Sequence, residues 1–319
     1  MKRKEIIAGN EISAVYEFVL GGHPQKVMIE GKEKSLPVVL TLHGGPGLPI
    51  PFSAGCRGMF PAFTDHFLMV CWDQLGCGIN DREIDDSFSI ASFVRMTIDL
   101  IRELKQIFRD NKIYLFATSW GSILSARVVE QCPELVDGAV VIGQIVKKIF
   151  FNEEVMEGLS RAGVPESKLA VIRSADAEHF SPKDLQLIAS CLRKYTDAYQ
   201  NRNGRQPAMG NIVRGLLTSP DYSFRDFKAV MWNGYRKNNS LWKEIIGLDL
   251  SEALREVKVP YLILQGDTDI VTPTKYVKEL AEAADNSCLK YRVVAQTGHL
   301  PGAAMMEELH RELLKLTAP

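Results

Sequence analysis

The chain has 319 residues, of which 46% are apolar, so it is long enough to bury a full α/β core and to carry an inserted subdomain. Its 38 basic and 39 acidic residues leave a net charge of −1, with no long run of either sign. This balance argues against nucleic acid or an anionic membrane as a partner and favours a small molecule or short peptide as substrate.

We expect no secretory signal in the first residues. They begin with basic side chains, but Glu5, Asn10, Glu11 and Glu17 interrupt the apolar stretch that a signal peptide needs. No apolar run elsewhere is long enough to span a bilayer. The six cysteines have no paired spacing, and no His or Cys cluster has metal-ligand spacing. We therefore expect reduced thiols in a cytoplasmic protein, without a metal or another cofactor.

Strand and helix patterns alternate in the first half of the chain. Residues 13–31 give two alternating segments typical of an antiparallel hairpin at a sheet edge. PVVLTLHGGPG (37–47) and FLMVCWDQLGCG (67–78) are apolar strands that end in glycine-rich loops, as in the middle of a covered parallel sheet. A helix over about 90–108 and a strand over 138–144 continue the alternation, which indicates right-handed crossovers and a doubly wound sheet.

The pattern changes between residues 146 and 245, where Gly, Pro and Asn separate helical segments and no convincing strand appears. One helix has explicit start signals, with Ser181 as N-cap, Pro182 at the first helical position and Asp184 at the third. We interpret this stretch as a helical insertion whose aromatic side chains mainly form its own small core.

The core pattern resumes with a strand and loop over 259–273 and a strand over 288–296, which brings the count to about eight strands. The sequence thus predicts a mostly parallel eight-stranded sheet flanked by helices, with a helical cap inserted after strand six. Residues 1–145 and 246–319 would form the core, and 146–245 the cap. This layout resembles an α/β-hydrolase.

The segment around Ser119 predicts a nucleophile elbow. The strand pattern over 113–118 becomes a helical pattern without an intervening loop. So sharp a turn strains its central residue and admits only small side chains two residues to either side, where Ala117 and Gly121 stand. The usual pattern is G-x-S-x-G, and this chain has A-T-S-W-G. The alternative is a serine that only caps an ordinary helix.

A serine hydroxyl needs a general base that a third group orients. In this architecture the partners follow in the order Ser, acid, His, each in a loop after a strand. Asp269 follows YLILQG and His299 follows YRVVAQ, which predicts a triad of Ser119, Asp269 and His299. Asp267 is the alternative acid. The later aspartate is preferred because it lies deeper in the loop, whereas Asp267 is expected to bond local backbone.

The loop HGGPG (43–47) is predicted to supply an oxyanion donor, because its glycines let backbone N–H groups approach a ligand closely. We expect the N–H of Gly45, or alternatively of Gly44, to act together with that of Trp120 at a helix N-terminus. His43 in this loop is interpreted as a structural hydrogen-bonding residue. Asp73 after the next strand is interpreted as a brace for the glycine loops.

HGGPG, WDQLGCG, S-W-G, GDTD and GH together resemble the prolyl aminopeptidase (proline iminopeptidase) family of serine peptidases, within the α/β-hydrolase superfamily. The resemblance covers both halves of the core. It implies the triad named above, an oxyanion hole from Gly45 and Trp120, a helical cap over the site, and release of an N-terminal residue, often proline, from short peptides.

The chain also departs from the family. Ala117 stands where the family usually has glycine, Leu75 where it has arginine, and Ile79 and Asn80 where it has arginine and serine. The family holds the substrate's ammonium with acidic groups from the cap, and the tryptophan-rich acidic motif that supplies them has no match here.

Several residues of the insertion are candidates for substrate binding by location only: Glu153, Glu154, Glu157 and Glu244, together with Trp232. The alternative for each glutamate is an exposed helix charge.

The first hypothesis is therefore a serine hydrolase that removes an N-terminal, proline-type residue from small peptides. A carboxylesterase or amidase acting on a small acyl substrate is the alternative within the same chemistry. From another class, the chain could be a non-catalytic ligand-binding protein that keeps the hydrolase fold.

Overall fold

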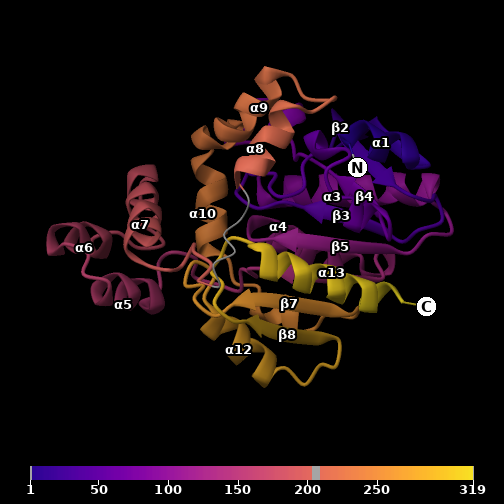
Figure 1. Ribbon diagram of the computed structural model, residues 1–319. Helices are drawn as coiled ribbons and strands as arrows, with labels where there is room; N and C mark the ends of the chain where they lie inside the picture. Colours follow the sequence, from indigo (N-terminus) through magenta and orange to yellow (C-terminus); the bar gives the residue numbers. More distant parts are fainter. Residues whose placement is uncertain (1, 203–208, 319) are drawn as a thin grey trace.

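The computed structural model describes residues 2–202 and 209–318. Eight strands form one sheet in the order β1-β2-β4-β3-β5-β6-β7-β8 (Figure 1). The strands are β1 (Ile12–Leu20), β2 (His23–Gly31), β3 (Val38–Leu42), β4 (Leu68–Cys71), β5 (Ile113–Thr118), β6 (Gly138–Ile142), β7 (Tyr261–Gly266) and β8 (Leu289–Val294). The β1–β2 and β2–β4 pairs are antiparallel and all others are parallel, so the predicted edge hairpin and mostly parallel sheet are confirmed.

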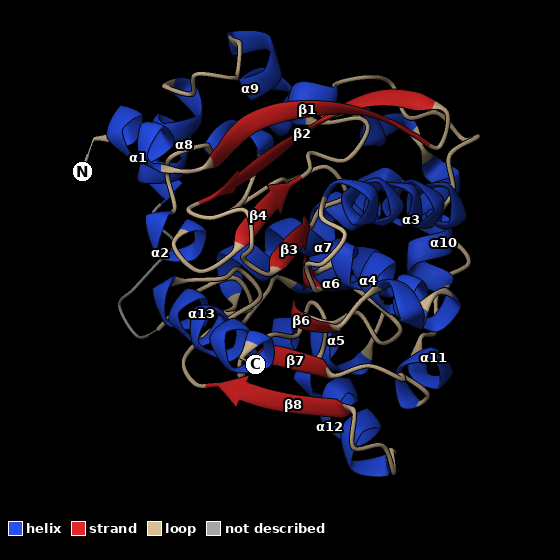
Figure 2. Ribbon diagram, turned by 90° about the vertical axis from the view of Figure 1, so that its right-hand side faces the viewer, coloured by secondary structure: helices blue, strands red, loops and turns tan. Residues whose placement is uncertain are grey.

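Helices cover both faces of the sheet, because its central strands are apolar on both sides. Every residue of β3, β4, β5 and β6 is buried. In Figure 2 one face carries α3 (Ile90–Ile107), α4 (Trp120–Gln131) and α11 (Ser251–Arg255), and the other carries α2 (Pro61–Thr64) and α13 (Ala303–Thr317). The two faces hold separate apolar clusters, one packed around Phe93 and Leu124 and the other around Met305 and Leu309. The remaining core helices are α1 (Arg3–Gly9) and α12 (Thr274–Ala283).

In its described residues, the segment between β6 and β7 contains helices and no strand. Besides α11, its α-helices are α5 (Glu153–Arg161), α6 (Glu166–Arg173), α7 (Pro182–Tyr195), α8 (Met209–Leu217), α9 (Phe224–Met231) and α10 (Asn239–Gly247). In Figure 1, α5, α6 and α7 project from one end of the molecule, while α8, α9 and α10 lie along its side. Helix α7 begins as predicted, with Ser181 as N-cap in a capping box with Asp184.

The two ends of this helical segment are pinned together. Lys147 forms an isolated bridge with Asp249, and the N–H of Leu250 donates to the carbonyl of Val146 at 2.8 Å. An insertion between two neighbouring strands of a sheet needs its two ends close together, and these contacts hold them so. The division into a core and a cap of residues 146–245 stays a prediction, which this pairing supports.

Two polar contacts fasten the helical segment to the rest of the chain near α8 and α9. Arg57 donates from Nε and one terminal nitrogen to the two carboxylate oxygens of Asp221, at 2.9 and 2.6 Å. The hydroxyl of the neighbouring Tyr222 donates to Asp73. No helix in the described part of the chain combines the length and apolarity needed to cross a membrane.

Candidate active site

Ser119 sits at the sharp junction between β5 and α4. Its backbone has φ 47° and ψ −115°, a conformation that non-glycine residues rarely adopt. A Cβ on Gly121 would lie 2.0 Å from the carbonyl oxygen of Leu42, so only glycine fits at that position. The expected elbow geometry is therefore present, and Ser119 itself remains partly exposed.

The structure brings Ser119, His299 and Asp269 into one hydrogen-bonded chain. The Nε2 atom of His299 lies 2.9 Å from Ser119 Oγ, and its Nδ1 atom lies 2.8 Å from Asp269 Oδ2. The side chains of His299 and Asp269 are only 8% and 1% exposed. This is the arrangement in which a histidine can accept the serine proton while a buried carboxylate fixes its orientation.

Asp269 is held by donors on both oxygens. Its Oδ1 accepts the N–H groups of Val271 and Thr272 at 2.9 and 3.0 Å. Its Oδ2 accepts the Thr272 hydroxyl at 2.8 Å and the Gln265 amide at 3.1 Å. These bonds fix the carboxylate, so Oδ2 stays aimed at the imidazole of His299.

Asp267 has a different role. Its carboxylate accepts the backbone N–H groups of Gln296 and Thr297 at 2.9 and 3.0 Å. It therefore braces the loop that carries His299, and the structure brings Asp269 rather than Asp267 to the imidazole.

Most of the other residues around His299 have no local signal in the sequence. A Cβ on Gly143, just after β6, would lie 3.1 Å from His299 Cε1, so this glycine leaves room for the ring. The Tyr199 ring meets the imidazole edge-on, with centroids 5.8 Å apart. The carbonyl of Ala198 accepts the N–H of His299 at 2.6 Å. Of these, only a glycine that directly follows a buried strand could have been noticed in advance.

The HGGPG loop lies against the elbow. A Cβ on Gly44 would be 3.3 Å from Ser119 Cβ, and Gly45 has φ 120°, which favours glycine. Among the described residues, neither the N–H of Gly45 nor that of Trp120 donates to another protein group. The oxyanion hole stays a prediction, which the lack of a protein acceptor at both groups supports, and the Trp120 N–H stands at the N-terminus of α4.

His43 is not a second base. Its Nε2 accepts the N–H of Gln74 at 2.9 Å, and its Nδ1 lies 2.9 Å from the carbonyl oxygen of Gly44. These partners require a neutral ring protonated at Nδ1. Burial lowers the pKa of His43 to about 4. The predicted structural role is confirmed.

Asp73 braces two loops, as predicted. Its carboxylate accepts the N–H groups of Ala54 at 2.8 Å and Ile79 at 3.0 Å, as well as the Tyr222 hydroxyl. Complete burial raises the pKa of Asp73 to about 6, although these hydrogen bonds oppose the shift.

The structure does not bring the three glutamates of α5 into the triad or the pocket described below. Glu157 is 67% exposed and pairs with Arg161 on the same helix. Glu154 lies 3.9 Å from Lys275 on α12, and Glu153 occupies the first turn of α5.

The other two candidates from the insertion are also elsewhere. The carboxylate of Glu244 accepts the N–H of Ile90 at 2.8 Å, where α3 begins. Trp232 follows α9 and is 60% exposed.

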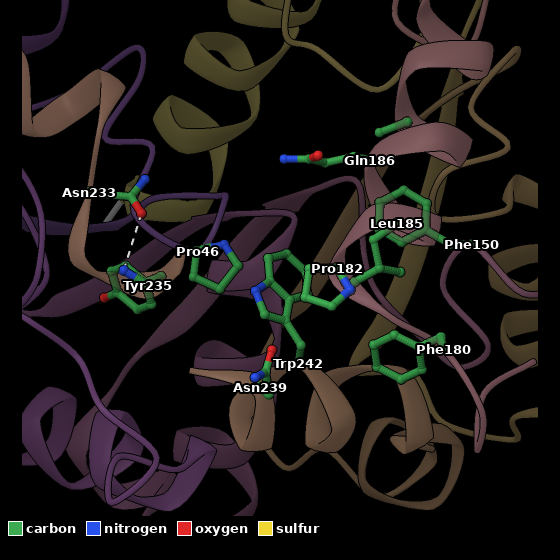
Figure 3. A pocket seen from close by; sticks show the side chains of 11 residues that line it. Pro46, Phe150, Phe180, Pro182, Leu185, Gln186, Asn233, Tyr235, Asn239 and Trp242 are labelled. Atoms are coloured by element: carbon green, nitrogen blue, oxygen red, sulfur yellow. Dashed lines mark hydrogen bonds between the residues drawn. The ribbon is translucent and has the colours of Figure 1, made fainter. Parts of the chain in front are cut away.

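A pocket of about 370 Å³ lies between the HGGPG loop and the helical segment (Figure 3). In Figure 3, Pro46 lies between the Asn233–Tyr235 pair and the aromatic side chains of Trp242 and Phe180. Its described lining residues are Pro46, Phe150, Phe180, Pro182, Leu185, Gln186, Ala189, Asn233, Tyr235, Asn239 and Trp242. Within residues 2–202 and 209–318, no three His, Cys, Asp or Glu side chains gather as a metal site would.

Comparisons with known proteins identify the family and the fold. Residues 37–302 match the family model described as alpha/beta hydrolase fold. The probable aminopeptidase YbaC of Bacillus subtilis is 28% identical over 303 residues, covering 91% of this chain and 92% of that protein. A proline iminopeptidase of Neisseria meningitidis is 35% identical over 285 residues, with 84% of each chain covered.

A solved structure shows the same fold. The proline iminopeptidase-related protein of Thermus thermophilus superposes with a TM-score of 0.61 at 21% identity, covering 97% of this chain and 99% of the other. The predicted fold and the resemblance to proline iminopeptidases are confirmed.

Proposed function

We propose that this chain, which belongs to the α/β-hydrolase fold family, is a serine hydrolase that cleaves an amide or ester bond of a small acyl substrate. The observation that carries the proposal is the hydrogen-bonded chain from Ser119 through His299 to Asp269, together with the N–H groups of Gly45 and Trp120, which have no acceptor among the described residues. Fold alone would not justify it, because this fold serves many activities.

The geometry supports acyl transfer in two halves. Ser119 Oγ attacks the substrate carbonyl while His299 Nε2 takes its proton, and the N–H groups of Gly45 and Trp120 bind the oxyanion. His299 then gives the proton to the leaving amine or alcohol, and an acyl-enzyme forms. Water attacks the acyl-enzyme and loses a proton to His299, which returns it to Ser119 as the acid leaves. Asp269 holds the tautomer and stabilises the imidazolium.

Two substrate classes fit this chemistry. The names of the relatives, proline iminopeptidase and probable aminopeptidase, support a peptide whose N-terminal residue is released. The pocket beside Pro46 supports the second class, an uncharged acyl ester or amide, because none of its described lining residues is acidic.

The test is turnover of proline p-nitroanilide and p-nitrophenyl acetate by the wild type, Ser119→Ala and Ser125→Ala. Ser125 is a buried serine further along α4 and serves as the matched control. We expect Ser119→Ala to lose activity by about 10⁴–10⁶ in kcat and Ser125→Ala to keep it, with both variants folded. Comparable turnover by Ser119→Ala would remove this serine from the mechanism. A wild type that binds these compounds without turnover would favour a ligand-binding protein.

A further inference from the structure

The wall of the pocket beside Pro46 is made mainly of apolar side chains. Helix α7 contributes Pro182 and Leu185, α10 contributes Trp242, and Phe150 and Phe180 come from the loops that precede α5 and α7. Pro46 directly follows the oxyanion-donor candidate Gly45, so one wall of this pocket belongs to the loop that lies against Ser119. We call this space the Pro46 pocket.

The polar side chains of the Pro46 pocket are neutral. They are the amides of Gln186, Asn233 and Asn239 and the phenol of Tyr235. The side-chain amide of Asn233 already has partners, because its nitrogen donates to the carbonyl of Gly47 and its oxygen accepts the N–H of Tyr235. The Tyr235 hydroxyl donates to the carbonyl of Leu75, so it also has a partner.

No carboxylate stands among the described lining residues of this pocket. Helices α7 and α10 carry one acidic residue each, and each of these carboxylates accepts a hydrogen bond at the start of a helix. Asp184 accepts hydrogen bonds from the N–H and hydroxyl of Ser181, and Glu244 accepts the N–H of Ile90. Nor can a carboxylate side chain come from outside the described residues, because 1, 203–208 and 319 include no Asp or Glu.

An ammonium group in the Pro46 pocket would therefore lose water without a carboxylate in the described pocket wall to replace it. Desolvation of an unpaired charge is costly, and attraction to a ring face such as that of Trp242 is weaker than this penalty. A neutral apolar group of similar size gains from leaving water and has no such cost.

We propose that the Pro46 pocket selects a neutral apolar acyl group, such as a cyclic or short branched alkanoyl ester or amide, over an aminoacyl group with a charged amine. The inference rests on the proposed function and narrows its substrate class. The enzyme would then apply the family's triad to substrates that have no free N-terminal ammonium.

The test compares two substrates that differ at one ring atom, prolyl p-nitroanilide and cyclopentanecarbonyl p-nitroanilide. The wild type should show at least tenfold higher kcat/KM for the cyclopentane compound at pH 6.5, where the prolyl amine is protonated. The ratio should shrink towards pH 9 as that amine loses its proton, since an α-amino group titrates near pH 8. Equal or better turnover of the prolyl compound at pH 6.5 would overturn the proposal.

A designed charge gives a second, independent readout. Gln186→Glu places a carboxylate in the pocket wall and should raise the prolyl-to-cyclopentane ratio at least tenfold at pH 6.5. Gln106→Glu makes the same change on the exposed side of α3 and should leave the ratio unchanged. An unchanged ratio in Gln186→Glu would show that the acyl group does not enter the Pro46 pocket.

Binding of the two compounds to Ser119→Ala separates the proposed function from the proposed pocket preference. Calorimetry should show at least tenfold tighter binding of the cyclopentane compound at pH 6.5. If the wild type turned over neither compound while this preference held, the proposed function would fail and the pocket preference would stand. If turnover depended on Ser119 but the prolyl compound bound as tightly as the cyclopentane compound, the pocket preference alone would fail.

Discussion

Gly121→Ala should disrupt the elbow more than the addition of a single methyl group suggests. The added methyl would lie 2.0 Å from the carbonyl oxygen of Leu42 and 2.6 Å from its carbonyl carbon. Both are backbone atoms at the end of β3, so no side-chain rotation can relieve the contact. Gly210 is the matched control, because it is likewise the second residue of a helix and a Cβ there would meet nothing within 4 Å.

The expected magnitude follows from two opposing effects. Alanine is about 1 kcal/mol better than glycine in a helix interior, whereas overpacking a rigid site costs about 1–3 kcal/mol or more. The Gly121→Ala contact is with fixed backbone, so the upper end applies, and we expect a net loss of about 2 kcal/mol in the free energy of unfolding. Gly210→Ala should be neutral or gain up to about 1 kcal/mol.

Urea unfolding of the three proteins measures these differences directly. Turnover of p-nitrophenyl acetate supplies a second measure, since a shift of about 1 Å at Ser119 should lower the rate about 10²-fold. If Gly121→Ala matched the wild type in both measurements, the reasoning about the elbow would be refuted.

Three further predictions concern buried polar groups. The pKa of His43 is lowered to about 4, so this residue contributes stability above about pH 6.5 that is lost as the pH falls through 4. The free energy of unfolding in urea should show this loss of about 3 kcal/mol in the wild type but not in His43→Asn. The pKa of Asp73 is raised to about 6, so its contribution is present below about pH 4 and lost as the pH rises through 6. The deficit of Asp73→Asn in free energy of unfolding, relative to the wild type, should therefore be about 3 kcal/mol larger at pH 4 than at pH 7.5. An equal deficit at both pH values would contradict the raised pKa of Asp73. Thr272→Val removes a donor to the Asp269 carboxylate and should lower kcat about tenfold, a loss of about 1.5 kcal/mol for a charged hydrogen bond. Thr274→Val loses only bonds to the backbone carbonyls of Gly266 and Asp269 and should keep the wild-type kcat.

The sheet and the elbow could be predicted because their signals are local. A fully buried strand needs an uninterrupted apolar run, and the turn at Ser119 needs small residues at fixed spacing on both sides. Asp269 and His299 could be named because chain order and strand ends place them at the same edge of a parallel sheet.

The groups that support the triad could not be found in this way. Gly143, Gln265 and Thr272 lie on segments that approach His299 only after the whole sheet has formed. Tyr199 comes from the helical segment, and nothing in its neighbouring sequence points to the imidazole.

Location within the insertion is too coarse a criterion for predicting substrate-binding residues. Which face of α5 or α10 meets the core depends on tertiary packing, and the structure directs Glu154 to Lys275 and Glu244 to the start of α3. The short helix α1 likewise has no clear signal in the sequence. It is fixed by Arg3, whose guanidinium donates to the carbonyls of Gly55, Arg57 and Gly215 at 2.6–2.8 Å.

Covalent labelling with a fluorophosphonate, mapped by mass spectrometry, is the most direct test of the account. The wild type should gain one adduct on Ser119, and the labelling rate should fall by about 10³ or more in His299→Ala, because the hydroxyl then has no base. Asp269→Asn should slow labelling strongly, and Asp267→Asn far less. An adduct on another residue, or equally fast labelling of His299→Ala, would contradict the proposed mechanism.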